Sequence, residues 1–275
     1  MRSSRRPPAN GLYAAGAIIL VVIAGGLWFG RGYLRDAYAN ATRPSVPVAI
    51  PYHPPVAASS TSATPPTAPP TQIIKAPTAT STAFAPELNL AVPFMLQAPK
   101  QNWVDPFEDA CEEASLLMVD GYYKGHAATW NADDAVQEIL DVVAYEDKTY
   151  GYNKDTTAND VAHTAMGYFG YPSAQVLDAT DYNIKNMLNM GYPVIIPADG
   201  KALKNPNFKN GGPEYHMLVI KGYKKDGSWI TNDPGTHNGP DYVYPHDRLL
   251  DAIHDFKHGD MQDGRKVIVV IIPKK

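Results

Sequence analysis

The longest apolar run of the chain lies close to its first residue. Residues 12–30, with the sequence LYAAGAIILVVIAGGLWFG, contain no charged side chain. Because a helical residue rises about 1.5 Å, a run of this length can cross a hydrocarbon core of roughly 30 Å. The pattern therefore predicts a transmembrane helix over residues 12–30, which would act as a signal anchor in the lipid bilayer.

The charges on either side of this run indicate its orientation. Arginines at positions 2, 5 and 6 precede it, whereas Arg31, Arg35 and Asp36 follow it. This bias favours a cytoplasmic N-terminal segment 1–11 and an extracytoplasmic remainder, as in a single-pass protein of the cell membrane. The alternative is a signal peptide cleaved after the small-residue motif Ala37-Tyr38-Ala39, although the run is long for that purpose and the two arginines interrupt the approach to the motif.

Residues 31–91 lack the periodic patterns of helices and strands. From Thr42 onward this segment is rich in Pro, Ala, Ser and Thr, and its only charged residues are Arg43, Lys75 and Glu87. Such a sequence cannot bury enough apolar surface to offset the entropy cost of ordering it. We therefore expect a juxtamembrane and disordered linker over residues 31–91, followed by a folded domain over residues 92–275.

Helical periodicity dominates the first half of the folded domain, and strand-like patterns dominate the second half. The expected helices start at Asp109, Asn131, Thr157 and Asp181, with a further helix near residues 245–257. The expected strands span residues 192–198, 215–223, 228–233 and 266–272, and Asp226-Gly227 joins the middle two as a hairpin. Helices that come first and strands that come later predict an α+β fold.

The first of these helices contains the single cysteine, Cys111, in its first turn. Asp109 and Glu112 have the spacing of a capping box, in which the glutamate reaches back to the backbone of the cap. We therefore expect Glu112 and Glu113 to lie on a solvated face of the helix. One cysteine also permits no disulfide within the chain.

The balance of charge limits the range of partners. Acidic side chains outnumber basic ones, which gives a formal net charge of −4 at pH 7. Nucleic acids and anionic membrane surfaces are bound by clusters of basic residues. The sequence therefore predicts no nucleic-acid partner, and its bilayer contact is expected through residues 12–30 alone.

A thiol nucleophile needs a histidine to take its proton and a polar group to orient that histidine. His216 opens an apolar strand, and hairpin pairing around residues 225–227 places it near position 234 of the other strand. Asp233 and Asn232 are therefore both expected within its reach.

Several sequence blocks resemble those of a known family. VPFMLQAP, ACEEASLLMVDGYY, GYPVIIP, EYHMLVIKGY and SWITNDPG follow one another between Val92 and Pro273. In this order they resemble the C39-like family of papain-fold cysteine peptidases. The family usually has glycine directly after the cysteine, whereas this chain has Glu112.

The resemblance implies a fold and a set of site residues. The fold is the papain-like α+β fold, in which N-terminal helices pack on a mainly antiparallel sheet. The implied roles are nucleophile for Cys111, general base and acid for His216, orienter of the imidazole for Asp233, and oxyanion donor for Gln97 together with the backbone N–H of Cys111. No cofactor and no metal are implied.

The expected function is hydrolysis of peptide bonds in a peptide or protein substrate near the cell envelope. Two alternatives remain open, a C39-like binding module with little or no activity and an amidase or acyltransferase that uses the same triad. Transglutaminase-like folds also order Cys, His and Asp, but they place the histidine much closer to the cysteine than His216 lies to Cys111.

Overall fold

The computed structural model describes residues 41–54, 84–126, 130–257 and 261–274. The chain divides into two compact units, Met1–Ser45 and Val46–Lys275. The predicted transmembrane helix over residues 12–30 and the segment 1–11 lie outside the described residues. Among the residues that are described, no helix has both the length and the apolar character needed to cross a membrane.

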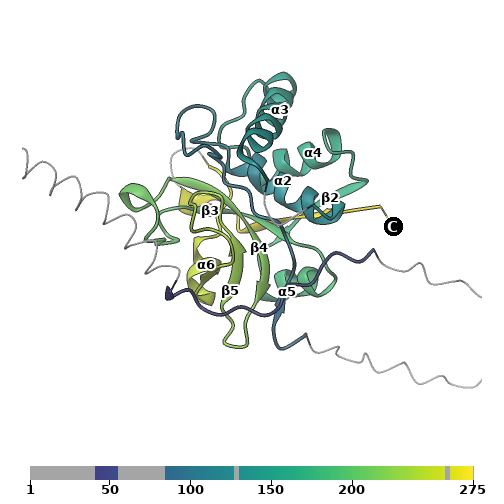
Figure 1. Cartoon of the computed structure of the whole chain (residues 1–275), viewed down its shortest axis with the longest axis vertical. Helices are drawn as coiled ribbons and strands as arrows, with labels where there is room; N and C mark the ends of the chain where they lie inside the picture. Colours follow the sequence, from purple (N-terminus) through teal and green to yellow (C-terminus); the bar gives the residue numbers. More distant parts are fainter. Residues whose placement is uncertain (1–40, 55–83, 127–129, 258–260, 275) are drawn as a thin grey trace, which may run out of the picture. The chain divides into compact units, whose positions relative to one another are not determined.

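An antiparallel sheet forms the centre of the second unit. Its strands are Leu88–Asn89 (β1), Ser173–Asp178 (β2), Val194–Asp199 (β3), Tyr215–Tyr223 (β4), Trp229–Asn232 (β5), Tyr242–Tyr244 (β6) and Val267–Ile272 (β7). They follow the order β2-β7-β3-β4-β5-β6, and β1 pairs with β4 off that path (Figure 1). Every pairing between these strands is antiparallel, which agrees with the predicted α+β class.

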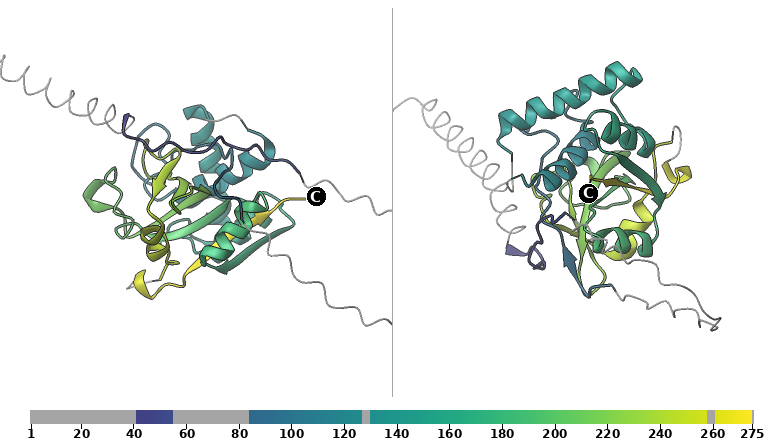
Figure 2. Two further views of the ribbon diagram at one scale, coloured as in Figure 1. Left: turned by 90° about the horizontal axis from the view of Figure 1, so that it is seen from below. Right: turned by 90° about the vertical axis from the view of Figure 1, so that its right-hand side faces the viewer.

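Helices cover both sides of the sheet. Their bounds are Cys111–Lys124 (α2), Ala132–Tyr150 (α3), Ala158–Gly167 (α4), Asp181–Asn189 (α5) and His246–Ala252 (α6), with short 3₁₀ helices at Lys209–Gly211 and Met261–Asp263. α2 and α4 pack against the sheet, and α3 packs on α2. Figures 1 and 2 show these three helices together on one side, whereas α5 and α6 lie on the other.

Position in these layers explains the sequence patterns. β3, β4 and β7 lie inside the sheet between helices, and their continuous apolar runs are buried on both faces. α2 lies between β4 and α3, and every residue from Cys111 to Tyr122 is buried. The nucleophile candidate therefore belongs to the most enclosed helix of the domain.

The start of α2 differs from the predicted capping box. The N-cap is Ala110, and no side chain caps the helix. Asp109 instead forms an ion pair with Lys154 at 3.0 Å. The two glutamates that follow Cys111 are buried, so the expectation that they face solvent was wrong. Because α2 is enclosed by other elements, no face of this helix is exposed to solvent at Glu112 and Glu113.

The other elements follow the sequence patterns to different degrees. Asn131 caps α3 and Thr157 caps α4 through side-chain hydrogen bonds, as their positions predicted. The predicted helix over residues 245–257 ends at Ala252, because Ile253 leaves it to form a β-bridge with Ala198. β1, β2 and β6 were not predicted.

Residues 46–91 of the predicted linker fall within the second compact unit. Part of it, residues 46–54 and 84–91, is ordered against the domain, where Ile50 forms a parallel bridge with Leu90. Tyr52 contacts the rings of Tyr122 and Tyr123 at centroid distances of 5.5 and 4.9 Å. A composition poor in periodic patterns does not prevent docking when sheet edges and aromatic side chains supply the partners.

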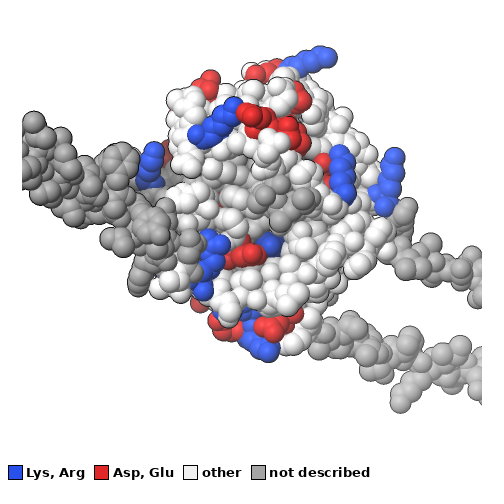
Figure 3. All heavy atoms as spheres, viewed as in Figure 1, with Lys and Arg blue, Asp and Glu red and all other residues white. Residues whose placement is uncertain are grey.

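Charged side chains of both signs share the surface. On the face seen in Figure 3, basic groups are separate from one another and lie beside acidic ones. Among the described residues, Lys154 bridges Asp105 and Asp109 at 2.8 and 3.0 Å. This face therefore offers no continuous basic stripe.

Candidate active site

Cys111 is the first residue of α2 and is 5% exposed. Its Sγ donates a hydrogen bond to Oε2 of Glu112 at 2.9 Å. Burial raises the pKa of the thiol well above its usual value, and the charge and hydrogen bond of Glu112 add to this effect, while the backbone of Met217 opposes it. The cysteine therefore rests as a neutral thiol that is hydrogen-bonded to a carboxyl group.

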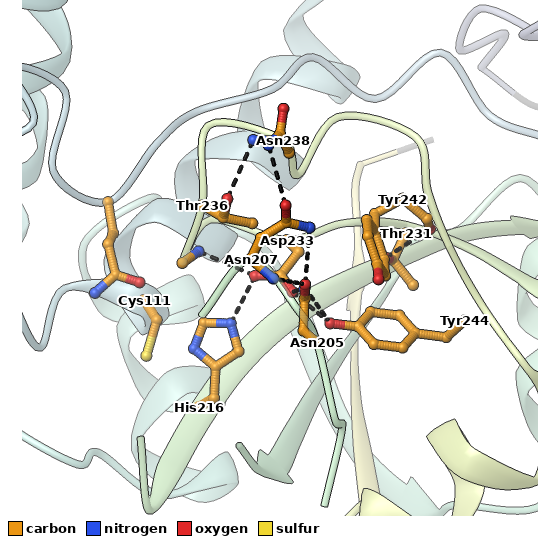
Figure 4. A network of polar contacts seen from close by, with 12 residues as sticks. Cys111, Asn205, Asn207, His216, Thr231, Asp233, Thr236, Asn238, Tyr242 and Tyr244 are labelled. Carbon is orange, nitrogen blue, oxygen red and sulfur yellow. Dashed lines mark hydrogen bonds and ion pairs between the residues drawn. The ribbon is translucent and has the colours of Figure 1, made fainter. Parts of the chain in front are cut away.

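His216 and Asp233 come together on neighbouring strands. β4 and β5 pair as far as Val219 and Asn232, and Asp233 directly follows β5. Nε2 of His216 lies 2.8 Å from Oδ1 of Asp233. Because a carboxylate can only accept, Nε2 carries the hydrogen and Nδ1 is left as a proton acceptor. Figure 4 shows this second ring nitrogen on the side of Cys111.

Asp233 is a fully buried carboxylate with a complete set of donors. Oδ1 accepts from His216 and from the backbone N–H of Gly235 at 3.0 Å. Oδ2 accepts from Tyr244 at 2.6 Å and from Asn205 at 3.0 Å (Figure 4). Burial alone would raise the pKa of Asp233, but the interaction with His216 and the other hydrogen bonds outweigh burial and hold the pKa below its usual value.

Asn205 ties the segment between β3 and β4 to this carboxylate. Its Nδ2 donates both to Asp233 and to the hydroxyl of Tyr244, at 3.0 and 2.8 Å. Its Oδ1 accepts from the side chain of Asn207 at 2.9 Å, and Asn207 in turn accepts from Asn238 at 3.1 Å. Two loops are thereby joined around the orienting carboxylate. Sequence reasoning missed Asn205 and Tyr244, since neither lies at a fixed distance from the histidine along the chain.

Asn232 has a different role from the one considered for it. Its Nδ2 donates to the carbonyls of Val92 and Pro93, both at 3.0 Å. Its Oδ1 accepts from the backbone of Asp241 at 3.2 Å. The amide thus fixes the chain that leads to Gln97 and leaves the histidine to Asp233.

Gln97 lies at the same end of the domain. Its backbone N–H donates to Pro234 at 3.1 Å, and its side-chain Nε2 donates to the carbonyls of Phe107 and Glu108 at 3.2 and 2.9 Å. Both hydrogens of the amide nitrogen are thus engaged. The oxyanion role of Gln97 stays a prediction, and it requires the amide to release one of these carbonyls.

Nothing in the described ranges points to a metal centre, because no group of three or more His, Cys, Asp or Glu residues there has a metal-binding arrangement. The site itself contains a thiol, an imidazole and their hydrogen-bond partners.

A cysteine at a helix start, with a histidine–aspartate pair on adjacent strands beside it, is the arrangement of enzymes that use a thiol nucleophile. The model of the Peptidase_C39 like family matches residues 89–256, a stretch that includes all three side chains. The chain belongs to this family, which confirms the resemblance seen in the sequence blocks.

Two solved structures are similar to parts of this chain. A protein described as a C39-like peptidase from Bacillus anthracis has 19% identity and a TM-score of 0.45, over 69% of this chain and 99% of its own. Interpain A, a cysteine protease of Prevotella intermedia, has 21% identity and a TM-score of 0.33, over 50% of this chain and 55% of its own. Among curated proteins, none matches this chain.

Proposed function

We propose that residues 92–275 hydrolyse peptide bonds in a peptide or protein substrate, with Cys111, His216 and Asp233 as a catalytic triad. The observation that carries this proposal is the buried hydrogen bond between His216 and Asp233 at 2.8 Å, on strands beside the helix that starts with the only cysteine. Membership of a peptidase family supports it.

The reaction follows from the positions of the protons. Nδ1 of His216 takes the thiol proton, and the thiolate of Cys111 attacks the scissile carbonyl to give a tetrahedral oxyanion. The backbone N–H of Cys111, which has no partner within the helix, and the amide of Gln97 are the donors proposed for this oxyanion. The imidazolium then protonates the leaving amine, and water activated by His216 hydrolyses the thioester.

A peptide-library screen of the purified domain tests this proposal. We expect cleavage by the natural chain, and loss of cleavage on Cys111→Ala or His216→Ala. Cleavage that survives Cys111→Ala contradicts the proposal. Analysis of products in the presence of added amines separates hydrolysis of peptide bonds from an amidase or acyltransferase reaction of the same triad.

One observation favours a binding module without catalysis. The thiol is buried and donates to Glu112, so its resting form is not nucleophilic. Reaction with iodoacetamide decides between the two functions. A peptidase requires alkylation well below pH 8 that depends on His216, whereas a binding module gives a thiol that titrates near 8.5 or higher whether or not His216 is present.

We also propose that residues 12–30 anchor the protein in the cell membrane and that the domain lies outside the cytoplasm. The uncharged run and the arginines before it support this placement. A reporter fused after Lys275 should be active only outside the cytoplasm, and a cytoplasmic signal contradicts the orientation. The N-terminal sequence of the mature protein separates a retained anchor from a cleaved signal peptide.

A further inference from the structure

Glu112 is a buried carboxyl group that is hydrogen-bonded to the thiol and to its own backbone N–H. Its side chain is 1% exposed, and Oε2 accepts from Sγ of Cys111 at 2.9 Å. The other oxygen, Oε1, is buried and has no hydrogen-bond partner among the described residues. An ionised carboxylate in such a place is costly, because no cation or set of donors replaces its water.

The groups around Glu112 add negative rather than positive charge. Glu113 of α2 and Glu146 of α3 are both fully buried, and their carboxyl groups meet each other. Asp155, in the loop before α4, also raises the pKa of Glu112, after burial and Glu146. On the sheet side, burial and then the charge of Glu112 raise the pKa of Tyr215 on β4.

The hydrogen bond between the sulfur of Cys111 and the carboxyl group of Glu112 can be donated by either group, depending on which of them is protonated. If Glu112 is ionised, it accepts from S–H, and a thiolate at 2.9 Å would face a like charge. If Glu112 has taken up a proton, its O–H can donate to a thiolate instead. The same short contact therefore opposes the nucleophile in one state and stabilises it in the other.

We propose that Glu112 is a proton switch on the nucleophile, which permits the thiolate only while its own carboxyl group is protonated. The proposal rests on the proposed role of Cys111. When Glu112 has gained a proton from solvent, the thiol proton passes to Nδ1 of His216, and the O–H of Glu112 hydrogen-bonds the thiolate that remains. When Glu112 loses that proton, the thiolate recovers its own from the imidazolium and becomes S–H.

Alkylation of the natural chain by iodoacetamide across pH tests the switch directly. Cys111 is the only cysteine, so the rate reports on one atom. We expect the rate to fall as pH rises through the ionisation of Glu112, and to rise again only when the thiol ionises in alkaline solution. A single monotonic rise with pH would overturn the proposal, even without any variant.

Glu112→Gln provides the matched variant, since an amide of the same size donates N–H to the thiolate at every pH. We expect the fall to disappear and the rate on its alkaline side to increase at least about tenfold, the effect of lowering the thiol pKa by one unit. Glu113→Gln makes the same change at the next residue, which does not contact the sulfur. This variant should still show the fall in alkylation rate. A Glu112→Gln profile equal to that of the natural chain overturns the proposal.

His216→Ala separates failure of the switch from failure of the proposed function. If this variant slows alkylation while Glu112→Gln leaves the profile unchanged, the triad stands and the switch is wrong. If His216→Ala changes nothing, the proposed peptidase function fails together with the switch that rests on it.

Discussion

At the scale of single residues, the site is organised around the carboxylate of Asp233. His216, Gly235, Tyr244 and Asn205 all donate to it within 3.0 Å. A buried carboxylate stays ionised only when donors replace its water, and an ionised Asp233 is what keeps the hydrogen on Nε2 of the imidazole. The residues that surround Asp233 are therefore expected to act on catalysis through the position and tautomer of His216.

Tyr244→Phe tests this dependence. It removes the 2.6 Å hydrogen bond to Oδ2 of Asp233 and leaves the ring in place. We expect a loss of about 1–3 kcal/mol in the free energy of unfolding and a higher pKa for Asp233. We also expect the acid limb of the pH profile of alkylation to move to higher pH.

Tyr242→Phe is the control, two residues away on the same strand. The hydroxyl of Tyr242 has no hydrogen bond with the carboxylate, and its substitution should leave all three quantities unchanged. Equal effects of the two substitutions on the pH profile would show that Tyr244 acts only through packing.

The sequence supported the histidine–aspartate pair better than it supported the surroundings of the thiol. Hairpin pairing around Asp226-Gly227 fixes which residues of two adjacent strands can meet, so Asp233 could be placed near His216 by counting. The environment of Glu112 depends on what packs on α2 from α3 and β4, which are distant in sequence. Local spacing suggested a cap, and the burial of the whole helix overrode it.

At the scale of elements, α2 and α3 meet through acidic side chains. Glu146 of α3 faces Glu113 of α2 and accepts a hydrogen bond from the hydroxyl of Thr164 on α4 at 3.0 Å. Burial and the charge of the neighbouring carboxyl group raise the pKa of Glu113, and burial raises that of Glu146. The packing of the three helices that cover this side of the sheet is therefore linked to pH.

Burial raises the pKa of Glu146 from an ordinary value of 4.5 to about 7. Between these pH values the unfolded chain has released a proton that the folded chain still holds. The contribution of Glu146 to stability is thus complete below about pH 4.5 and is lost as pH rises to about 7, by as much as about 3 kcal/mol.

Glu146→Gln should remove most of this loss, because the amide accepts from Thr164 and donates to Glu113 at every pH. Urea unfolding at pH 5 and at pH 8 measures the effect, with a gain of about 1–3 kcal/mol expected for the variant at pH 8 only. Asp141→Asn, at an exposed position of the same helix, should change stability by less than about 0.5 kcal/mol at either pH. A variant that is less stable than the natural chain at pH 8 contradicts this account.

Helix and strand ends that depend on contacts close in sequence could be predicted, whereas those that depend on distant contacts could not. Asn131 and Thr157 set helix starts through hydrogen bonds within one turn, and those starts could be predicted. The end of α6 depends on Ala198, far away in the chain, which draws Ile253 into a bridge. β1 likewise owes its existence to the edge of β4 rather than to its own two residues.

At the scale of the whole molecule, the ordered parts of the predicted linker change how the domain is delimited. Ile50 and Leu90 meet in a bridge, so residues 46–54 and 84–91 both belong to the folded part of the chain. If residues 12–30 anchor the protein, the stretch that separates the anchor from the domain is reduced to residues 31–45. Its reach is about 50 Å when fully extended, roughly a quarter of what the whole linker 31–91 would allow.

The docked segment 46–54 should contribute to stability although the family match begins only at residue 89. We expect a chain that begins at residue 84 to unfold about 1–3 kcal/mol more easily than one that begins at Val46, since it loses the bridge of Ile50 and the aromatic contacts of Tyr52. For a domain of this size each kcal/mol corresponds to roughly 2–4 °C in Tm. Within the longer chain, Tyr52→Ala should reproduce much of the loss, whereas Val48→Ala, at a position that is 90% exposed, should not. Equal Tm values for the two chain lengths would mean that the segment does not dock in solution, and the domain would then begin where the family match begins.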